Sequence, residues 1–210
     1  MEFDLEMTDN LLATTRAVRK RLDLDKPVPR EVILDCIALS MQAPTGSNSQ
    51  GWRWVIVDDA AKRAALGELY REAGSAYLAA GAKATQGAGQ TGRVMTSALW
   101  LAENMGKVPV LAIPCVEGQF PEGAPPAMLA SQYASIYPAV WSFQLALRAR
   151  GLGSTLTTLH LLRAAEAAEI LGLPDNMLQV AMLPVAYTKG TDFKRAGRPG
   201  PETIVRWNQW

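Results

Sequence analysis

Residues 128–150 form the segment that most restricts how this chain can fold. It is apolar almost all round, whereas a helix on a protein surface keeps one polar face. Pro138 is expected to kink the helix, and Gly151 and Gly153 follow its end. At a period of 3.6 residues the large side chains fall on one face and the strip beside it: Ile136, Val140, Phe143 and Leu147, with Tyr137, Trp141 and Leu145. The pattern predicts a long central helix buried on several sides.

The rest of the chain supplies elements that can surround this helix. Hydrophobic periodicity predicts further helices at 7–18, 29–43, 60–80, 94–105 and 162–171, and strands at 54–57, 108–116 and 178–187. The run 108–116 is apolar throughout, which is typical of a strand buried on both faces, and its prolines favour irregular or edge pairing. This order of elements indicates the α+β class, with helices packed on a sheet.

We expect a single domain over residues 1–210, because no segment between breaks is large enough to fold alone. Residues 81–92 are small and polar, and the sequence favours a mobile, lid-like excursion that begins there and extends to about residue 130. Gly87, Gly89 and Gly92 do not make a dinucleotide fingerprint, since no strand is predicted before them and no acidic residue follows at the required distance.

Composition excludes several classes of function. Hydrophobic residues make up 49% and charged residues 20%, which is typical of a folded globular protein. The net charge of +1 gives no field that attracts nucleic acid or a membrane surface, and no apolar run reaches the ~18 residues of a membrane span. The N-terminus is acidic and lacks the apolar core of a signal peptide, so we expect a cytoplasmic protein. Cys36 and Cys115 are interpreted as buried free thiols.

Familiar catalytic motifs are missing from the sequence. His160 is the only histidine, so it cannot form a histidine metal site, and we expect a structural role for it. There is no Cys-x-x-Cys pair, Gly-x-Ser-x-Gly elbow or phosphate-binding loop of the P-loop type. Polar or basic residues gather instead in four segments, 15–21, 44–52, 154–160 and 194–198. Each has a structural alternative, such as a capped turn or a complemented helix end, but together they favour binding of a large polar anion that supplies the reactivity itself.

Four motifs, taken in order, resemble the nitroreductase family of FMN-dependent oxidoreductases, and the resemblance covers the chain from Thr14 to Trp210. The most specific is the loop 43–52, Ala-Pro-Thr-Gly-Ser-Asn-Ser-Gln-Gly-Trp, against a family pattern of roughly Ala-Pro-Ser-Gly-x-Asn-x-Gln-Pro-Trp. The second is 15–19, Thr-Arg-Ala-Val-Arg, against Arg-Arg-Ser-x-Arg. The others are Gly-Leu-Gly-Ser at 151–154 with Leu-Thr-Thr at 156–158, and Arg198-Pro199 before a Trp-Asn-Gln-Trp end.

The resemblance implies a nitroreductase-like fold, in which a mostly antiparallel sheet is flanked by helices and the C-terminal tail extends over the partner of a homodimer. Trp207 and Trp210 favour a tail that is docked against protein, such as a partner subunit, since two tryptophans are unusual at a frayed terminus. Two FMN sites would lie at the subunit interface. The segment with Arg16, Ala17 and Arg19 would hold the phosphate together with Arg195 or Arg198. The other implied contacts are Pro44, Thr45, Gly46 and Asn48 from the partner, and Leu156, Thr157 and Thr158 along the reactive edge of the flavin.

The implied activity is a ping-pong reaction, in which NAD(P)H reduces FMN and a small acceptor such as a nitroaromatic or quinone then reoxidises it. No side chain is assigned as a catalytic acid. Thr15, Ala17 and Gly51 depart from the family pattern, which has arginine, serine and proline there. Three alternatives stay open at this point: dehalogenation or metabolite oxidation with the same cofactor, flavin binding without turnover, and an interaction protein that binds no ligand.

Overall fold

The computed structural model describes residues 2–118, 121 and 123–210. Its α-helices are α1 Leu5–Thr14, α2 Arg30–Ser40, α3 Ala60–Thr85, α4 Gly89–Asn104, α5 Pro126–Ala149 and α6 Ala164–Leu171. Its strands are β1 Trp52–Val57, β2 Val110–Glu117, β3 Leu152–Ser154, β4 Met177–Gln179 and β5 Leu183–Tyr187. Every strand pair is antiparallel, with the order β1-β2-β5-β3 and β4 paired to β2. The predicted α+β class with a sheet flanked by helices is confirmed.

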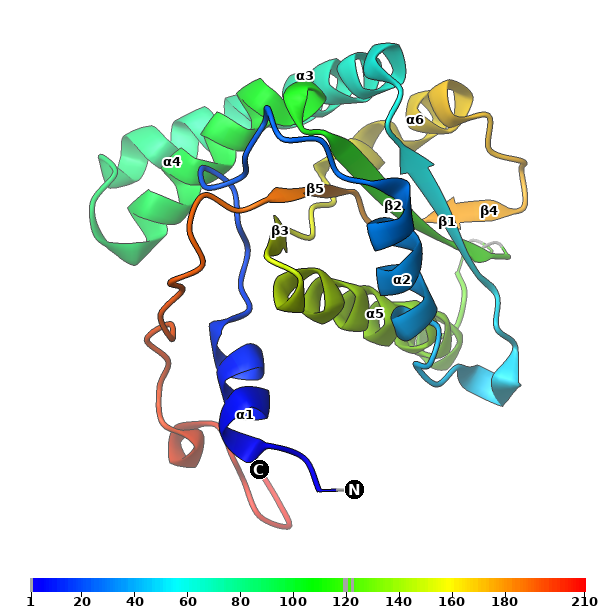
Figure 1. The fold of residues 1–210 in the computed structure, drawn as a ribbon. Coiled ribbons are helices and arrows are strands. Elements are labelled where there is room, and N and C mark those ends of the chain that lie inside the picture. Colours follow the sequence, from blue (N-terminus) through cyan, green and yellow to red (C-terminus); the bar gives the residue numbers. More distant parts are fainter. Residues whose placement is uncertain (1, 119–120, 122) are drawn as a thin grey trace.

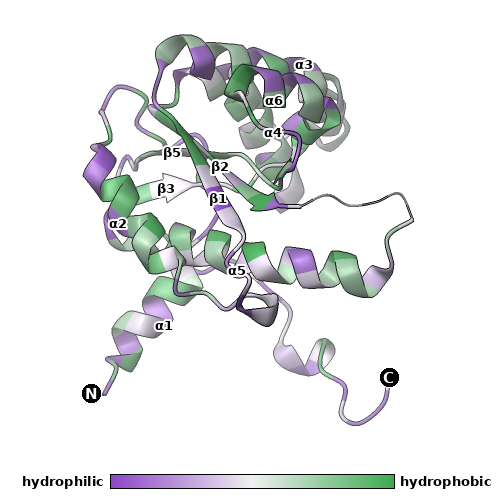
Figure 2. Ribbon diagram, turned by 90° about the vertical axis from the view of Figure 1, so that its right-hand side faces the viewer, coloured by the Kyte–Doolittle hydropathy of each residue, from purple (hydrophilic) through white to green (hydrophobic). Residues whose placement is uncertain are grey.

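The sheet is the middle of three layers. Helices α3, α4 and α6 cover one face, and α2 and α5 cover the other (Figures 1 and 2). Alternation along β2 explains both cores, since Leu111, Ile113 and Cys115 pack toward α3 and α4 while Val110 and Ala112 pack toward α5. The prediction that the all-apolar run is a strand buried on both faces is therefore confirmed. Its two faces each pack into a separate hydrophobic core, one on each side of the sheet.

The irregular pairing expected from the prolines of this strand occurs on one side only. On that side β2 pairs with β5 through residues 110–112 and with β4 through residues 115–117. Pro114 lies between these two ladders, and its carbonyl accepts a hydrogen bond from the Val180 N–H (3.1 Å). The single strand predicted at 178–187 is thus two short strands, because the neighbouring proline has no N–H to continue one ladder. β2 itself is central, so the edge alternative is wrong.

Helix α5 is central as predicted, but it is buried only along its C-terminal half. Ile136, Val140, Phe143 and Leu147 are fully buried, whereas Trp141 is 44% exposed and the large side chains of the first turns face solvent. The sheet and α2 pack against the C-terminal half of this helix, whereas Met128 and Tyr133 in its N-terminal half are exposed.

Three other boundaries differ from the sequence-based prediction. The first helix starts after Asp4, which caps it by accepting from the Met7 N–H, and it ends at Thr14 rather than Val18. Helix α3 ends at Thr85 rather than at residue 80, and Asp59 caps its start by accepting from the Lys62 N–H, while the Asp58 carboxylate is paired with Arg30. The short strand β3 was missed, and the helix predicted at 162–171 begins as a 3-10 turn at Leu159.

The segment 81–92 is not the irregular excursion that its composition predicted. Helix α3 continues to Thr85, and α4 starts at Gly89 after a tight turn in which Gly87 and Gly89 have φ of +69° and +65°. The glycines permit this turn and its close packing on the start of α4, since a Cβ on Gly92 would lie 2.4 Å from the Gly87 carbonyl carbon. Whether this hairpin closes over a ligand stays a prediction, and the part of the expected excursion at 119, 120 and 122 lies outside the described residues.

No helix in the described part of the chain is both long and apolar enough to cross a membrane. The C-terminal tail diverges from α1, as Figure 2 shows, and ends with Trp207 and Trp210 83% and 100% exposed. These tryptophans do not dock on their own chain, so their burial against a partner stays a prediction.

Candidate functional site

The basic segment after α1 is held in an extended course along the end of the sheet. The Val18 N–H donates to the Ser154 carbonyl (2.9 Å), and the Asp23 N–H donates to the Tyr187 carbonyl (2.8 Å). Gly153 makes this approach possible, since a Cβ there would lie 2.9 Å from Val18 Cβ. The arginines predicted at a helix terminus therefore project from a strand-like segment, because α1 stops at Thr14.

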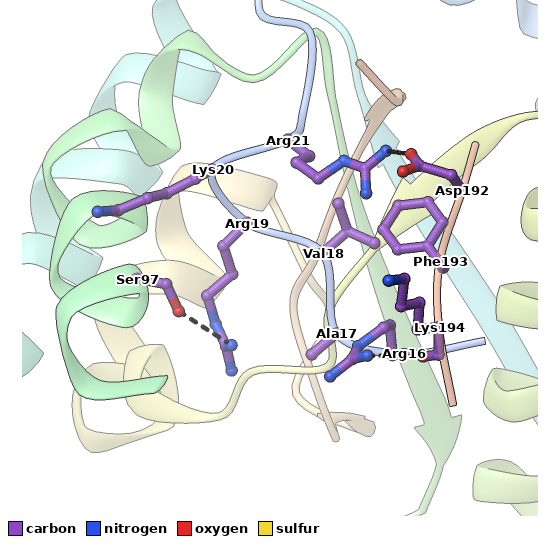
Figure 3. A pocket seen from close by; sticks show the side chains of 10 residues that line it. All are labelled: Arg16, Ala17, Val18, Arg19, Lys20, Arg21, Ser97, Asp192, Phe193 and Lys194. Atoms are coloured by element: carbon purple, nitrogen blue, oxygen red, sulfur yellow. Dashed lines mark hydrogen bonds and ion pairs between the residues drawn. The ribbon is translucent and has the colours of Figure 1, made fainter. Parts of the chain in front are cut away.

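The C-terminal tail runs along the other side of this segment and is tied to it by charged side chains. The Arg16 guanidinium donates to the Lys194 carbonyl (2.8 Å), and Arg21 forms an ion pair with Asp192 (2.7 Å). The Phe193 ring lies between the guanidinium carbons of Arg21 and Arg148, 4.2 Å and 4.7 Å from its centroid. Figure 3 shows Arg16, Arg21, Asp192 and Phe193 around the segment. Residues about 175 positions apart in the chain thus share one surface.

A hollow of about 470 Å³ opens beside this surface. Among the residues that line it are Arg16, Ala17, Arg19 and Arg198, together with Trp141 from α5. Arg195 lines an adjoining hollow of about 350 Å³, which shares Arg16, Ala17 and Arg19 with the first. The structure therefore brings together all five residues predicted to grip a phosphate.

The arginines of the hollow have no acidic partners in the described chain. Arg16, Arg19, Arg195 and Arg198 form no ion pair with a carboxylate of residues 2–118, 121 and 123–210. Arg19 is half-buried, and its guanidinium donates only a long hydrogen bond to Ser97 Oγ on α4 (3.4 Å). Burial lowers the pKa of Arg19, which means that its charge is held with incomplete solvation. Such a group favours an anionic ligand over water.

The Leu156–Thr158 stretch lies on the same side of the molecule as the arginines. The buried Tyr70 of α3 connects them, because it interacts with the Thr157 side chain and with Arg19. Burial raises the pKa of the Tyr70 hydroxyl, whereas the hydrogen bond with Thr157 and the charge of Arg19 lower it. The Thr157 N–H and hydroxyl both donate to the Met182 carbonyl (3.1 and 2.7 Å). Leu156 and Thr158 are exposed. Of the two threonine hydroxyls, that of Thr158 is therefore the one left for a ligand.

The loop after α2 lies far from the basic hollow, at the opposite side of the molecule in Figure 1. It is docked on α5, where the Gly46 N–H donates to Ser135 Oγ (2.9 Å). Ser47, Asn48 and Gln50 all have left-handed backbone angles, with φ of 52°, 53° and 49°. This conformation costs roughly 1–2 kcal/mol for a residue such as serine, so the loop holds strain of the kind found at functional sites. Pro44, Thr45, Gly46 and Asn48 do not meet the arginines within one chain.

Comparison with known proteins identifies the family that shares this arrangement of sheet and helices. The model of the nitroreductase family matches residues 12–187. The chain belongs to the nitroreductase family. The matched range includes Arg16, Arg19, the loop and Thr158, whereas Arg195 and Arg198 lie beyond it.

Individual nitroreductase-family proteins are similar along nearly their whole length. An iodotyrosine deiodinase from Thermotoga neapolitana is 25% identical over 197 residues, which cover 94% of this chain and 96% of that protein. The structure of an oxidised iodotyrosine deiodinase bound to FMN and 3-iodo-L-tyrosine has a TM-score of 0.69 at 24% identity, covering 95% of this chain and 98% of that one. The FMN-dependent nitroreductase NfnB of Mycobacterium smegmatis, in complex with NADPH, has a TM-score of 0.71 at 20% identity, covering 97% and 99%. These likenesses establish the nitroreductase-like fold.

Sequence reasoning missed several residues around the nitroreductase-family site. Gln90, Arg93 and Ser97 of α4 line the hollows, but Gln90 lies in the segment 81–92 that was predicted to be irregular, Arg93 lies at its border, and Ser97 lies in the helix predicted at 94–105. Trp141 was predicted to be a core residue and instead faces the hollow. Tyr70 carried no signal beyond its place on the buried face of a helix. A helical reading of 89–97 would have placed Gln90, Arg93 and Ser97 on one face.

The remaining candidates are structural. His160 is fully buried, neither ring nitrogen has a partner among the described residues, and burial lowers its pKa to about 4. Cys36 and Cys115 are buried free thiols as predicted, and burial raises the pKa of Cys115 to about 12. Within residues 2–118, 121 and 123–210, no cluster of three or more His, Cys, Asp or Glu side chains is placed to hold a metal ion.

Proposed function

We propose that this chain is an FMN-dependent oxidoreductase that takes electrons from NAD(P)H and passes them to a small organic acceptor such as a nitroaromatic or a quinone. The observation that supports it best is the hollow lined by Arg16, Arg19 and Arg198, which form no ion pair in the described chain and which the family resemblance implies as phosphate contacts. Bound FMN would supply the redox chemistry, and the chain would supply its grip and orientation.

The residues of the hollow fit this cofactor. A phosphate needs several donors in fork geometry, which Arg16 and Arg198 offer without competition from a described carboxylate. Arg19 donates a long hydrogen bond to Ser97 Oγ, and its charge acts on the Tyr70 hydroxyl. Trp141 adds an exposed aromatic surface to the wall of the hollow. The lining thus combines arginine side chains that can bind the phosphate with the aromatic surface of Trp141, which can contact the flavin ring.

The loop residues Pro44, Thr45, Gly46 and Asn48 are proposed to complete the site of a partner chain. Within one chain they lie opposite the arginines, so a site that uses both needs a homodimer. The exposed N-terminal half of α5, next to the loop, offers an apolar face for that contact, with Met128 and Tyr133 exposed. Thr158 is proposed to contact the edge of the cofactor, where its hydroxyl can donate to a nitrogen that gains charge on reduction.

NAD(P)H and the acceptor are proposed to enter the same space in turn, so that the reaction is ping-pong. No titratable side chain other than arginine or lysine lines the hollow of about 470 Å³ in the described residues. We therefore propose that the protons delivered to the acceptor come from solvent rather than from a side-chain acid.

A second candidate is reductive dehalogenation of a halogenated phenol. It is favoured by the similarity to an iodotyrosine deiodinase, which is 25% identical and extends over 94% of this chain. The two candidates share cofactor and site and differ only in the acceptor. They are therefore separated by substrate tests rather than by the fold.

The decisive experiment starts with the purified protein. A yellow protein that releases FMN on denaturation supports the flavin assignment, and a colourless protein that takes up no added FMN would refute it. Anaerobic titration with NADH and with NADPH then tests the electron donor: a flavin that neither nucleotide bleaches argues against a nicotinamide-driven reductase. Steady-state rates with matched nitroaromatic, quinone and iodophenol acceptors finally divide the reductase from the dehalogenase.

A further inference from the structure

The surface around the basic segment carries more positive charge than one cofactor phosphate can neutralise. The three adjoining hollows are lined by eight basic residues and a single described carboxylate, Asp192, which is already paired with Arg21. The basic residues are Arg16, Arg19, Lys20, Arg21, Arg93, Lys194, Arg195 and Arg198. A flavin phosphate brings at most two negative charges. Because like charges held together disfavour the folded state, this surplus points to another anionic ligand.

The two tail arginines separate the site into two parts. Arg198 lines the hollow of about 470 Å³ with Trp141, whereas Arg195 lines the hollow of about 350 Å³ with Arg93 of α4. Arg16 and Arg19 border both. Arg198 thus belongs with the aromatic wall proposed for the cofactor, whereas Arg195 shares its hollow with Arg93; Gln90 and Val94 of α4 line both hollows.

Helix α4 places Arg93 beside the cofactor grip but not within it. Arg93 and Ser97 are four residues apart, so they lie on one face of the helix about 6 Å apart along its axis. Ser97 contacts the Arg19 guanidinium (3.4 Å), as Figure 3 shows. Neither Arg93 nor Arg195 forms an ion pair with any described carboxylate. The pair is therefore free for a ligand one helical turn beyond Arg19.

We propose that Arg93 and Arg195 form a second anion subsite, which binds a phosphate or carboxylate group of the molecule that exchanges electrons with the cofactor. This inference rests on the proposed function and adds a substrate preference to it. The anionic group has two possible sources of the same chemistry: the 2′-phosphate that distinguishes NADPH from NADH, or a carboxylate on the acceptor. Guanidinium forks recognise both groups by paired, charge-assisted hydrogen bonds.

The test uses the FMN-loaded protein and the variants Arg93→Gln and Arg195→Gln, which remove charge but keep a polar side chain. The first arm compares kcat/KM for NADPH with kcat/KM for NADH. The second reduces the protein with dithionite and compares its reoxidation by 4-nitrobenzoate and by uncharged nitrobenzene. Arg71→Gln is the matched control, since Arg71 lies on α3 and is paired with Glu68 away from the hollows.

We expect Arg93→Gln to keep its FMN, and we expect both variants to lose selectivity for the charged partner in one arm by about tenfold or more, as the loss of one charge-assisted bond predicts. A fall in the NADPH to NADH ratio identifies the reductant as the source, and a fall in the nitrobenzoate to nitrobenzene ratio identifies the acceptor. Unchanged ratios in both arms would overturn the subsite. Loss of FMN in Arg93→Gln would overturn it too, because Arg93 would then belong to the cofactor grip. Failure of the proposed function itself is distinguishable, since it appears as absence of FMN in the unaltered protein.

Discussion

The basic hollow and the loop at residues 44–50 are both polar, but they are built in opposite ways. The hollow takes its shape from backbone hydrogen bonds that fix residues 18–23 to β3 and β5, and its side chains are charged. The loop has no ionisable side chain between Ala43 and Gly51, is tied to α5 through Gly46 and Ser135, and holds three residues in left-handed conformation. The partly desolvated arginines of the hollow are held by a backbone that is fixed to the sheet. The loop carries only uncharged hydrogen-bonding groups, which a strained backbone can present.

Acid is expected to have the largest effect on stability, because His160 is fully buried in the 3-10 turn that begins at Leu159, whereas the loop at residues 44–50 has no ionisable side chain. The folded-state pKa of His160 is about 4, against about 6.5 for an unfolded chain. The unfolded state therefore binds the proton first, and folding stability falls as pH drops from about 6.5 to about 4, by on the order of 3 kcal/mol. Urea unfolding at several pH values measures this loss.

His160→Leu is the control for this acid effect, since neither ring nitrogen has a described partner to lose. Its stability should depend less on pH over the same interval, with a remaining slope from paired carboxylates such as Asp192. An identical slope in the variant and the unaltered protein would show that His160 does not titrate in this range.

Removal of one arginine should affect the cofactor far more than removal of one loop residue. Arg16→Ala deletes a charge-assisted donor to the proposed phosphate, and we expect the FMN dissociation constant to rise roughly 10- to 100-fold. Arg71→Ala on α3 serves as the control, and Asn48→Ala in the loop should raise the constant by less than tenfold. Fluorescence titration of the FMN-free protein gives the constants. Equal values for Arg16→Ala and Arg71→Ala would count against the phosphate assignment.

Mixed dimers test whether hollow and loop belong to different chains. One chain carries Arg16→Ala, and the other carries Gly46→Val, whose added side chain meets Ser131 and Ser135 at about 3 Å and displaces the loop. If each site takes its arginines from one chain and its loop from the other, a mixed dimer has one intact site and binds half the normal FMN. Differently tagged chains and flavin absorbance measure this. A mixed dimer no better than the parent variants would place both regions in one chain.

Much of this fold was predictable because its main elements carry strong patterns. Helix α5 and the doubly apolar β2 were recognised from periodicity and run length, and the arginine segment from its charge. The missed parts depend on neighbours. β3 has three residues and includes Gly153, which shows no strand preference alone, and the break between β4 and β5 is imposed by Pro114 on another strand. The α3–α4 hairpin was mistaken for a flexible excursion because its glycines serve close packing, so Arg93 was missed with it.

The support of the hollow should be more sensitive to one added methyl group than the loop is. In Gly153→Ala the new Cβ would lie within 3.0 Å of Val18 and Thr188, so the arginine segment must shift away from β3. Such overpacking costs about 1–3 kcal/mol of folding stability, and it should also weaken FMN binding. Thermal unfolding and FMN titration measure the two effects, and full stability together with normal binding would contradict the close packing of this segment.

Gly51→Ala should have the smallest effect and is the counterpart in the loop. A Cβ at Gly51 meets Glu117 and Val116 only at ordinary van der Waals distances of 3.8–3.9 Å, and its φ is not left-handed. The added methyl group restricts the unfolded chain, so we expect a gain in folding stability of at most about 1 kcal/mol and no change in FMN affinity. Urea unfolding resolves the difference. A clear loss of stability or of FMN in this variant would mean that the loop is packed as tightly as β3, and the contrast between strained loop and rigid support would fail.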